Sequence, residues 1–160
     1  MRRKIINIAV NSVIIIISFA FILAYMFGFI VLGVVEGPSM EPLFQTGDLV
    51  IIIKVNSKNN INIYNNGIDV NDVIVFIKSN GKGLIIHRVI SMVNLGNRIY
   101  YVTKGDNNAL PDYQEFEGPG VPSERVIGKV LEICGIPFKI PLIGYLPIII
   151  RQFTAESLTF

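Results

Sequence analysis

The first 35 residues contain the longest apolar stretch of the chain. Residues 5–35 carry no charged side chain and include four consecutive isoleucines at Ile14–Ile17. A helix that spans a bilayer needs about 20 apolar residues, at ~1.5 Å rise per residue across ~30 Å of hydrocarbon. The pattern therefore predicts a membrane anchor over residues 1–35, with length to spare for tilt or interfacial ends.

Two other interpretations of this stretch are a cleaved secretion signal and a buried core helix. The apolar part of a secretion signal is usually only about 7–15 residues long, and no small-x-small cleavage motif follows this one. A buried helix would show a periodic polar face, and none is visible. Arg2, Arg3 and Lys4 precede the stretch, and positive residues stay on the cytoplasmic side. We therefore expect a single membrane pass, with a cytoplasmic N-terminus and an extracytoplasmic domain.

From residue 49 the pattern changes to short runs of Ile, Val and Tyr, which are typical of half-buried strands. Clusters of Asn, Gly and Ser separate these runs and predict turns. We predict a mainly β fold, with one all-β barrel or sandwich over residues 36–139 and no long helix after the anchor. The predicted strands are Leu49–Val55, Asp72–Ile77, Leu84–Met92, Arg98–Thr103 and Arg125–Ile133.

Residues 140–160 form an apolar C-terminal segment. Its first part, Ile140–Ile150, reads IPLIGYLPIII and is interrupted by two prolines and a glycine. This run is too short and too broken to span a bilayer as a regular helix. We expect a strand or loop that packs on the core or dips into the membrane surface. A second spanning helix is the alternative.

Charge and cysteine content narrow the function classes. Beyond residue 35 the chain carries 11 Lys and Arg against 12 Asp and Glu, so the domain is near neutral, which argues against a nucleic-acid partner. The single cysteine, Cys134, cannot form a disulfide within the chain, and one Cys with one His is too few for a metal cluster. Its apolar neighbours do not favour a reactive thiolate, so we interpret it as a small buried hydrophobe. No metal and no cofactor are expected.

Two residues stand out as candidates for chemistry. His87, the only histidine, lies in the strand-like run IIHRV. A neutral imidazole can accept a proton near neutral pH, although a lone strand histidine is more often structural. Ser39 lies in EGPSMEP, four residues beyond the apolar stretch, where Gly37 and Pro38 predict a sharp turn. A plain turn serine is the alternative, but this position places a hydroxyl at the membrane–water boundary, where a lipid-anchored substrate would arrive.

Two aspartates, Asp106 and Asp112, lie in the segment TKGDNNALPDY. Aspartates beside Gly and Asn are usually turn formers. Each is also a candidate for the carboxylate that orients a catalytic histidine, and the pattern alone does not choose between them.

Taken in order, these segments resemble type I signal peptidases, in particular the archaeal and endoplasmic-reticulum branch. The resemblance covers about residues 1–135, and it is the order of the motifs behind an anchor that makes it specific. The matching residues are Ser39-Met40-Glu41-Pro42, Gly47-Asp48-Leu49-Val50, Asp72-Val73-Ile74-Val75-Phe76, His87-Arg88-Val89, Thr103-Lys104-Gly105-Asp106-Asn107-Asn108-Ala109 and Gly128-Lys129-Val130.

The resemblance implies a catalytic set. In this family the serine of the SMEP motif is the nucleophile, and this branch uses a histidine as general base where bacterial relatives use a lysine. It implies Ser39 as nucleophile, His87 as base, Asp112 as the carboxylate that orients His87, and Asp106 as a supporting residue. Such a serine needs an adjacent base, and the tetrahedral oxyanion needs donors, one of which we expect to be the backbone N–H of Ser39.

The resemblance also implies a substrate and a binding surface. The substrates would be secretory preproteins whose signal peptides lie in the membrane, and family members accept small residues before the scissile bond. Membrane lipid is the other expected partner, and the sequence does not identify further subunits. An extended substrate is expected to pair with a strand edge. The candidate substrate-binding residues are Met40, Leu43, Ile74, Val75 and Phe76.

Two alternatives belong to other classes. The family usually has a glycine immediately before the nucleophile and often a hydroxyl residue before that, whereas this chain has Gly37-Pro38. This departure motivates a non-catalytic, membrane-anchored β-domain that acts as an accessory subunit. A self-cleaving regulator with a related β-fold is the other alternative, but such proteins usually carry a DNA-binding module and a lysine base, and this chain has an anchor and a histidine instead.

Overall fold

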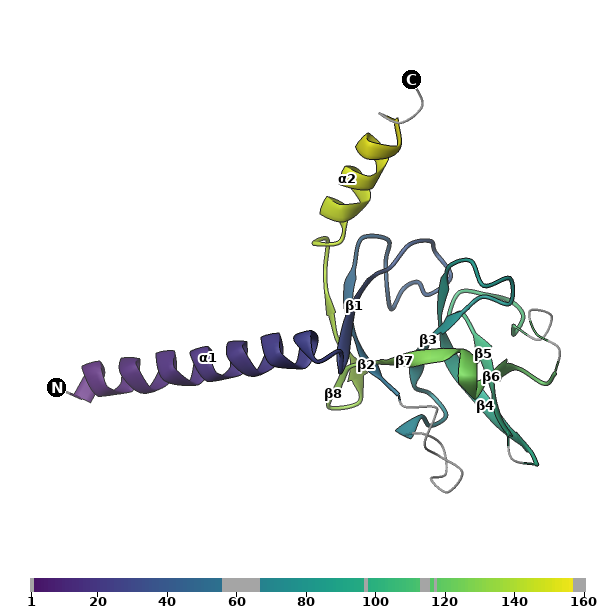
Figure 1. Ribbon diagram of the computed structural model, residues 1–160, viewed down its shortest axis with the longest axis horizontal. Coiled ribbons are helices and arrows are strands. Elements are labelled where there is room, and N and C mark those ends of the chain that lie inside the picture. The colour runs from purple at the N-terminus through teal and green to yellow at the C-terminus, as the bar shows by residue number, and fades with distance from the viewer. Residues whose placement is uncertain (1, 56–66, 97, 113–115, 117, 157–160) are drawn as a thin grey trace.

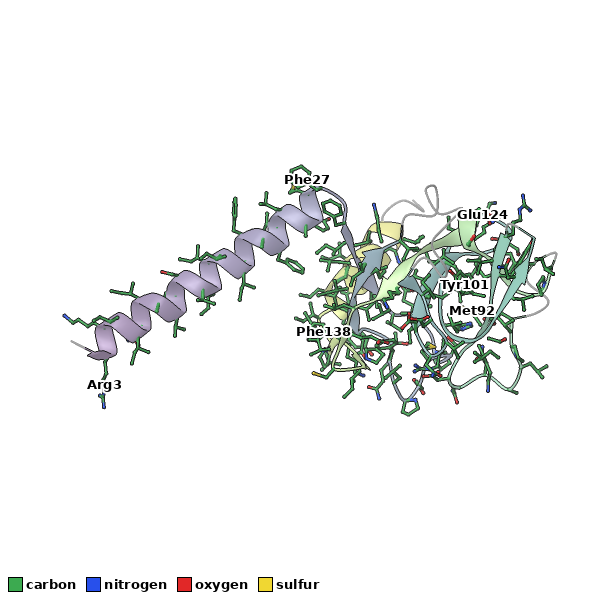
Figure 2. All side chains as sticks on the ribbon, turned by 90° about the horizontal axis from the view of Figure 1, so that it is seen from below. Arg3, Phe27, Met92, Tyr101, Glu124 and Phe138 are labelled. Carbon is green, nitrogen blue, oxygen red and sulfur yellow. The ribbon has the colours of Figure 1, made fainter. Side chains whose placement is uncertain are left out.

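The protein is described by a computed structural model that covers residues 2–55, 67–96, 98–112, 116 and 118–156. Figure 1 shows a sheet-rich domain, a long N-terminal helix that projects from one side of it, and a short C-terminal helix. The long helix, α1 (Arg2–Met26), contains a segment, Arg3–Met26, that is long and apolar enough to cross a membrane. Figure 2 shows its side chains projecting on all sides, clear of the domain, with Arg3 and Phe27 at opposite ends. The predicted apolar helix is confirmed.

The helix ends nine residues before the end of the predicted anchor region. Gly28 has a φ of 71°, a left-handed conformation that glycine adopts without strain, and it turns the chain away from the helix axis. The next residues form strand β1 (Ile30–Val34), which pairs antiparallel with β2 (Leu49–Lys54). The apolar run therefore holds two elements, and the second belongs to the sheet.

One antiparallel sheet forms most of the domain, as the predicted mainly β fold requires. Its strand order is β1-β2-β7-β3-β4-β5-β6, with β10 paired to β2, and a separate hairpin is formed by β8 and β9. The remaining elements are β3 (Val73–Ile77), β4 (Leu84–Leu95), β5 (Arg98–Lys104), β6 (Val121–Pro122), the 3-10 helix η2 (Ser123–Arg125), β7 (Val126–Val130), β8 (Glu132–Ile133), β9 (Ile136–Pro137) and β10 (Lys139–Ile140).

The predicted strands match this sheet with two differences. The predicted run 125–133 is divided into β7 and β8, which lie in different sheets, and strands β1, β6, β9 and β10 were not predicted. Two of the turn-forming clusters predicted between strands are Asn56–Asn60 and Asn65–Gly67, and of these residues only Gly67 lies within the described part of the chain. The expectation of no helix after the anchor is wrong, because helix α2 (Tyr145–Glu156) begins within the apolar run. Pro147 is tolerated there because the N–H groups of a first helical turn have no partner within the helix.

Strand β3 lies between two hydrophobic cores. Successive side chains of a strand point to opposite faces, and β3 is apolar and buried on both. Val73 and Val75 belong to a first core, and Ile74 and Phe76 belong to a second. The first core also contains Val35, Met40, Phe44, Val50, Ile52 and Val130; the second also contains Ile68, Val89, Tyr101, Val121 and Val126.

Tyr101 and Cys134 lie in opposite environments, one buried and one exposed. Burial raises the pKa of Tyr101 to about 12, so this phenol in the second core stays protonated at neutral pH. Cys134, predicted to be buried, is exposed. It has a φ of 54° between β8 and β9, so it forms the tip of a hairpin rather than part of a core strand.

Candidate active site

Ser39 lies in a turn that follows β1 and is fixed on both sides. Before it, the N–H of Gly37 donates to Thr46 Oγ1 at 3.1 Å. After it, Met40 is fully buried in the first core, and the N–H of Phe44 donates to the Met40 carbonyl at 2.9 Å. The apolar residue after the serine therefore fixes this turn to the core.

His87 on β4 is paired with a carboxylate. Its Nδ1 lies 2.6 Å from Asp112 Oδ2, and the two side chains are only 8% and 11% exposed. The Thr103 hydroxyl donates to the same Asp112 oxygen at 2.7 Å, and the Asp112 N–H donates to the Thr103 carbonyl at 2.9 Å. Thr103 of β5, the strand paired with β4, thus fixes the position of Asp112. The Phe76 ring meets the imidazole edge to face, with centroids 6.3 Å apart.

The loop after β5 joins the serine turn to the histidine pair. Asn107 donates its backbone N–H to the Ser39 carbonyl at 2.8 Å and its side-chain amide to the Pro38 carbonyl at 3.1 Å. Gly105 lies so close that a Cβ there would be 2.6 Å from the Ser39 carbonyl oxygen. Only glycine permits this approach, so the loop sequence and the position of the serine turn depend on each other.

Ser39 and His87 line the same cavity, of about 780 Å³. Its walls come from β1, β2, β3 and β4, and its polar lining also includes Asn108, Lys78, Glu36 and Arg151. The apolar lining residues include Leu32, Val34, Val50, Ile52, Val75 and Ile86. The cavity is therefore a groove of mixed polar and apolar lining, with a serine and a histidine on its walls.

The second predicted carboxylate, Asp106, is paired elsewhere. Its two oxygens accept from Arg88 Nε at 2.8 Å and Arg88 Nη2 at 2.7 Å. These hydrogen bonds raise the pKa of Arg88 above its usual value. Arg88 also donates to the Asn71 carbonyl at 2.8 Å, so this arginine ties the loop after β5 to the segment before β3. The structure brings Asp112, and not Asp106, to His87.

The predicted substrate-binding residues occupy different places. Val75 lines the cavity. Met40, Ile74 and Phe76 are fully buried in the two cores, Leu43 packs against the first core, and none of these four is among the cavity-lining residues. Their apolar character reflects core packing, and the groove is lined instead by β1 residues, which the sequence pattern had placed in the anchor.

Several residues of the site were not singled out from the sequence. Thr103 and Asn107 belong to the motif that supports the resemblance, but a hydroxyl in a strand and an asparagine in a turn carry no distinctive signal. Glu36 and Arg151 both line the cavity and form an ion pair at 2.8 Å, although 115 positions separate them. Among the described residues, no three His, Cys, Asp or Glu side chains lie close enough together to hold a metal ion.

The sequence is similar to those of several known proteins. The chain is 34% identical over 122 residues to the signal peptidase complex catalytic subunit SEC11 of Pyricularia oryzae, which covers 74% of this chain and 63% of the relative. It is 29% identical over 122 residues to the SEC11 subunit of Yarrowia lipolytica, covering 76% and 63%. It is 31% identical over 87 residues to signal peptidase I W of Bacillus subtilis, covering 54% and 41%. No family model matches the chain.

The chain spans less than two thirds of the length of these relatives. The matches nevertheless include both eukaryotic and bacterial proteins, and all three relatives are named as signal peptidases. With an apolar N-terminal helix before a β-domain, and with the ordered motifs around Ser39 and His87, the chain belongs to the type I signal peptidase family.

Proposed function

We propose that this protein is a membrane-anchored serine endopeptidase that removes signal peptides from secretory preproteins, with Ser39 as nucleophile, His87 as general base and Asp112 as the carboxylate that orients His87. The observation that carries the proposal is the pairing of His87 with Asp112 at 2.6 Å on the wall of the cavity that Ser39 also lines. The names of the SEC11 and bacterial relatives support the substrate class.

The proposed mechanism begins with the histidine tautomer. With Nδ1–H donating to Asp112, Nε2 carries a lone pair and accepts the proton of the Ser39 hydroxyl as the oxygen attacks the substrate carbonyl. Asp112 then stabilises the imidazolium that forms. The Thr103 hydroxyl, which donates to the same carboxylate oxygen, keeps Asp112 oriented toward the ring.

The oxyanion that develops on the substrate requires hydrogen-bond donors. The C=O and N–H of one trans peptide unit point in opposite directions. Asn107 holds the Pro38 carbonyl at 3.1 Å, so it also sets the direction of the Ser39 N–H in the same peptide unit. We therefore assign the Ser39 N–H as one oxyanion donor and Asn107 as the residue that orients it.

The groove suits an extended apolar peptide. Strand β1 is the end strand of the sheet, and three of its residues, Leu32, Gly33 and Val34, line the cavity. Such an edge offers unpaired backbone groups to an added strand, and the neighbouring side chains set which residues fit. In this proposal the protein acts at a cell membrane or an endoplasmic-reticulum-type membrane, with its domain on the extracytoplasmic side.

The test is to replace Ser39 by Ala and to follow cleavage of a preprotein by the full chain in membranes. We expect kcat to fall by at least about 10³-fold, because removing the nucleophile leaves only binding and oxyanion stabilisation. A circular dichroism spectrum and melting temperature equal to those of the parent protein provide the folding control. The accessory-subunit alternative makes the opposite prediction, since a Ser39→Ala/His87→Ala double variant would then support processing fully.

A further inference from the structure

The outward side of α2 and of the turn before it is apolar. Leu142, Ile143, Leu146, Ile149 and Ile150 are exposed by 65%, 50%, 66%, 44% and 61% of their surfaces. At about 100° per residue, the three helical members of this set lie on one side of the helix axis. Leu142 and Ile143 lie in the turn just before the helix. Isolated exposed apolar residues are common, but a continuous stripe is not.

The opposite side of α2 is attached to the domain. Gly144, just before the helix, donates its N–H to the Gly47 carbonyl at 2.9 Å. One turn later Ile148 is half-buried, and one turn further Arg151 pairs with Glu36 at 2.8 Å. Because these attachment points recur every three or four residues, they define an inward face, and the apolar stripe lies opposite to it.

The anchor determines which surface the stripe meets. Only residues 27–29 separate α1 from β1, and three extended residues reach at most about 11 Å. Phe27 and Phe29 are 72% and 66% exposed, and the Phe29 carbonyl accepts from the Lys54 N–H at 2.9 Å. A bilayer that contains α1 therefore lies directly against the domain.

The views place α2 at this boundary. Figure 1 shows α2 on the side of the domain from which α1 leaves, running across the direction of α1 rather than along it. Figure 2 places Phe138, which precedes β10, on the domain side that faces α1, and Glu124 on the far side. The exposed Ile133 and Ile136 of the β8–β9 hairpin lie in the same part of the chain as Phe138.

We propose that α2 lies in the interface of the bilayer that α1 crosses, with Leu146, Ile149 and Ile150 at the boundary between headgroups and acyl chains. Amphipathic helices in this position bury their apolar face about 5–10 Å deep. A second copy of the chain or another protein would suit the same stripe, but the bilayer is the surface that α1 already brings to it. Neither this position nor its test depends on the proposed proteolysis.

One consequence does rest on the proposed function. Arg151 and Glu36 both line the cavity that contains Ser39, so the inward face of α2 contributes to the wall of that cavity. A helix held in the interface by its outer face would keep the cavity opening at the bilayer surface, where a membrane-embedded signal peptide emerges.

The test measures the depth of α2 in the full chain. Cys134→Ser removes the native thiol, and Leu146→Cys or Ile150→Cys then carries an environment-sensitive fluorophore in vesicles of phosphatidylcholine and phosphatidylglycerol. Glu124→Cys on the far side of the domain is the matched control. We expect brominated lipids to quench the label at both α2 positions and not at residue 124, and aqueous iodide to quench the α2 labels about fivefold less than the control.

Two results would overturn the proposal. Iodide quenching at both α2 positions equal to that at residue 124, without quenching by brominated lipid, would place the stripe in water. Protection from both quenchers would instead indicate a protein occupant, and dilution into excess lipid would then distinguish a second copy from a tightly bound subunit. Because the readout is independent of cleavage, an inactive Ser39→Ala chain must give the same quenching, and the two proposals can fail separately.

Discussion

His87 and Arg88 are neighbours on β4, and each is paired with one aspartate of the same loop, yet the two pairs differ. The side chains of His87 and Asp112 are 8% and 11% exposed, whereas those of Arg88 and Asp106 are 25% and 22% exposed. Successive side chains of a strand point to opposite faces, and only His87 lines the cavity. One sequence motif thus supplies partners for two separate sites.

Asp106 and Asp112 have different chemical partners and therefore different roles. A guanidinium stays protonated in proteins, so the Arg88–Asp106 pair cannot exchange a proton with a substrate, whereas an imidazole can. Arg88 contacts two backbone segments through Asp106 and the Asn71 carbonyl. We therefore interpret Arg88–Asp106 as a brace for the loop and His87–Asp112 as the proposed reactive pair.

Neutralising each aspartate in turn should separate the roles of the two pairs most clearly. Asp112→Asn should lower kcat by about 10³–10⁴-fold, because an amide stabilises the wrong histidine tautomer and cannot balance the imidazolium. Asp106→Asn should lower kcat by less than about tenfold, since it removes only a partly exposed ion pair. Steady-state kinetics on one preprotein checks both variants. Equal losses would contradict the division of roles.

The pH dependence separates the pairs in a second way. Only a neutral imidazole accepts a proton, so activity that depends on His87 as general base should decline on acidification. The Asp106→Asn variant should show the same profile, because its pair takes no part in proton transfer. Activity is measured in membranes from about pH 8 to about pH 5, with the melting temperature followed in parallel. A flat profile would argue against His87 as the base.

A smaller effect is expected at the residue that holds Asp112. Thr103→Val keeps the shape of the side chain but removes the hydroxyl that donates to Asp112 at 2.7 Å. A hydrogen bond to a charged group contributes about 1.5–3 kcal/mol, so kcat should fall by about ten- to 150-fold. Thr103→Ser keeps the donor and should retain most of the activity. If both variants behave alike, the hydroxyl has no part in orienting Asp112.

The smallest effect is expected from a change in the brace. Arg88→Lys keeps the positive charge but loses the two parallel hydrogen bonds to Asp106. We expect a loss of about 1 kcal/mol or less in the free energy of unfolding and a kcat within about threefold of the parent value. Thermal unfolding and kinetics on the same preparation measure the two quantities. A large fall in kcat with unchanged stability would move Arg88 into the reactive site.

Much of the sheet was predictable from the chain, because β3, β4 and β5 are bounded by turn-forming residues and have strand-typical composition. Strand β1 was not, since the apolar composition continues from α1 through Phe27 and Phe29, and Gly28 alone marks the change from helix to strand. Helix α2 was missed because its proline lies in the one turn that tolerates it.

The site was less predictable than the fold. The resemblance favoured Asp112 as the partner of His87, and this contact is present, while its catalytic role stays a prediction. The cavity walls could not be identified from apolar runs, because Met40, Ile74 and Phe76 are as apolar as Leu32 or Val34 but point into a core. Which face a side chain occupies depends on strand register, and a run of consecutive apolar residues does not encode it.

The shared strand β3 has a consequence for how the domain loses activity. Ser39 is held by Met40 in the first core, and the His87 ring contacts the ring of Phe76 in the second. Because β3 supplies alternate side chains to both cores, neither half retains a complete set of packing partners without the other. The domain should therefore unfold as one cooperative unit. In a variant with a cavity-forming substitution on either face of β3, cleavage should be lost at the same lowered temperature at which the sheet melts.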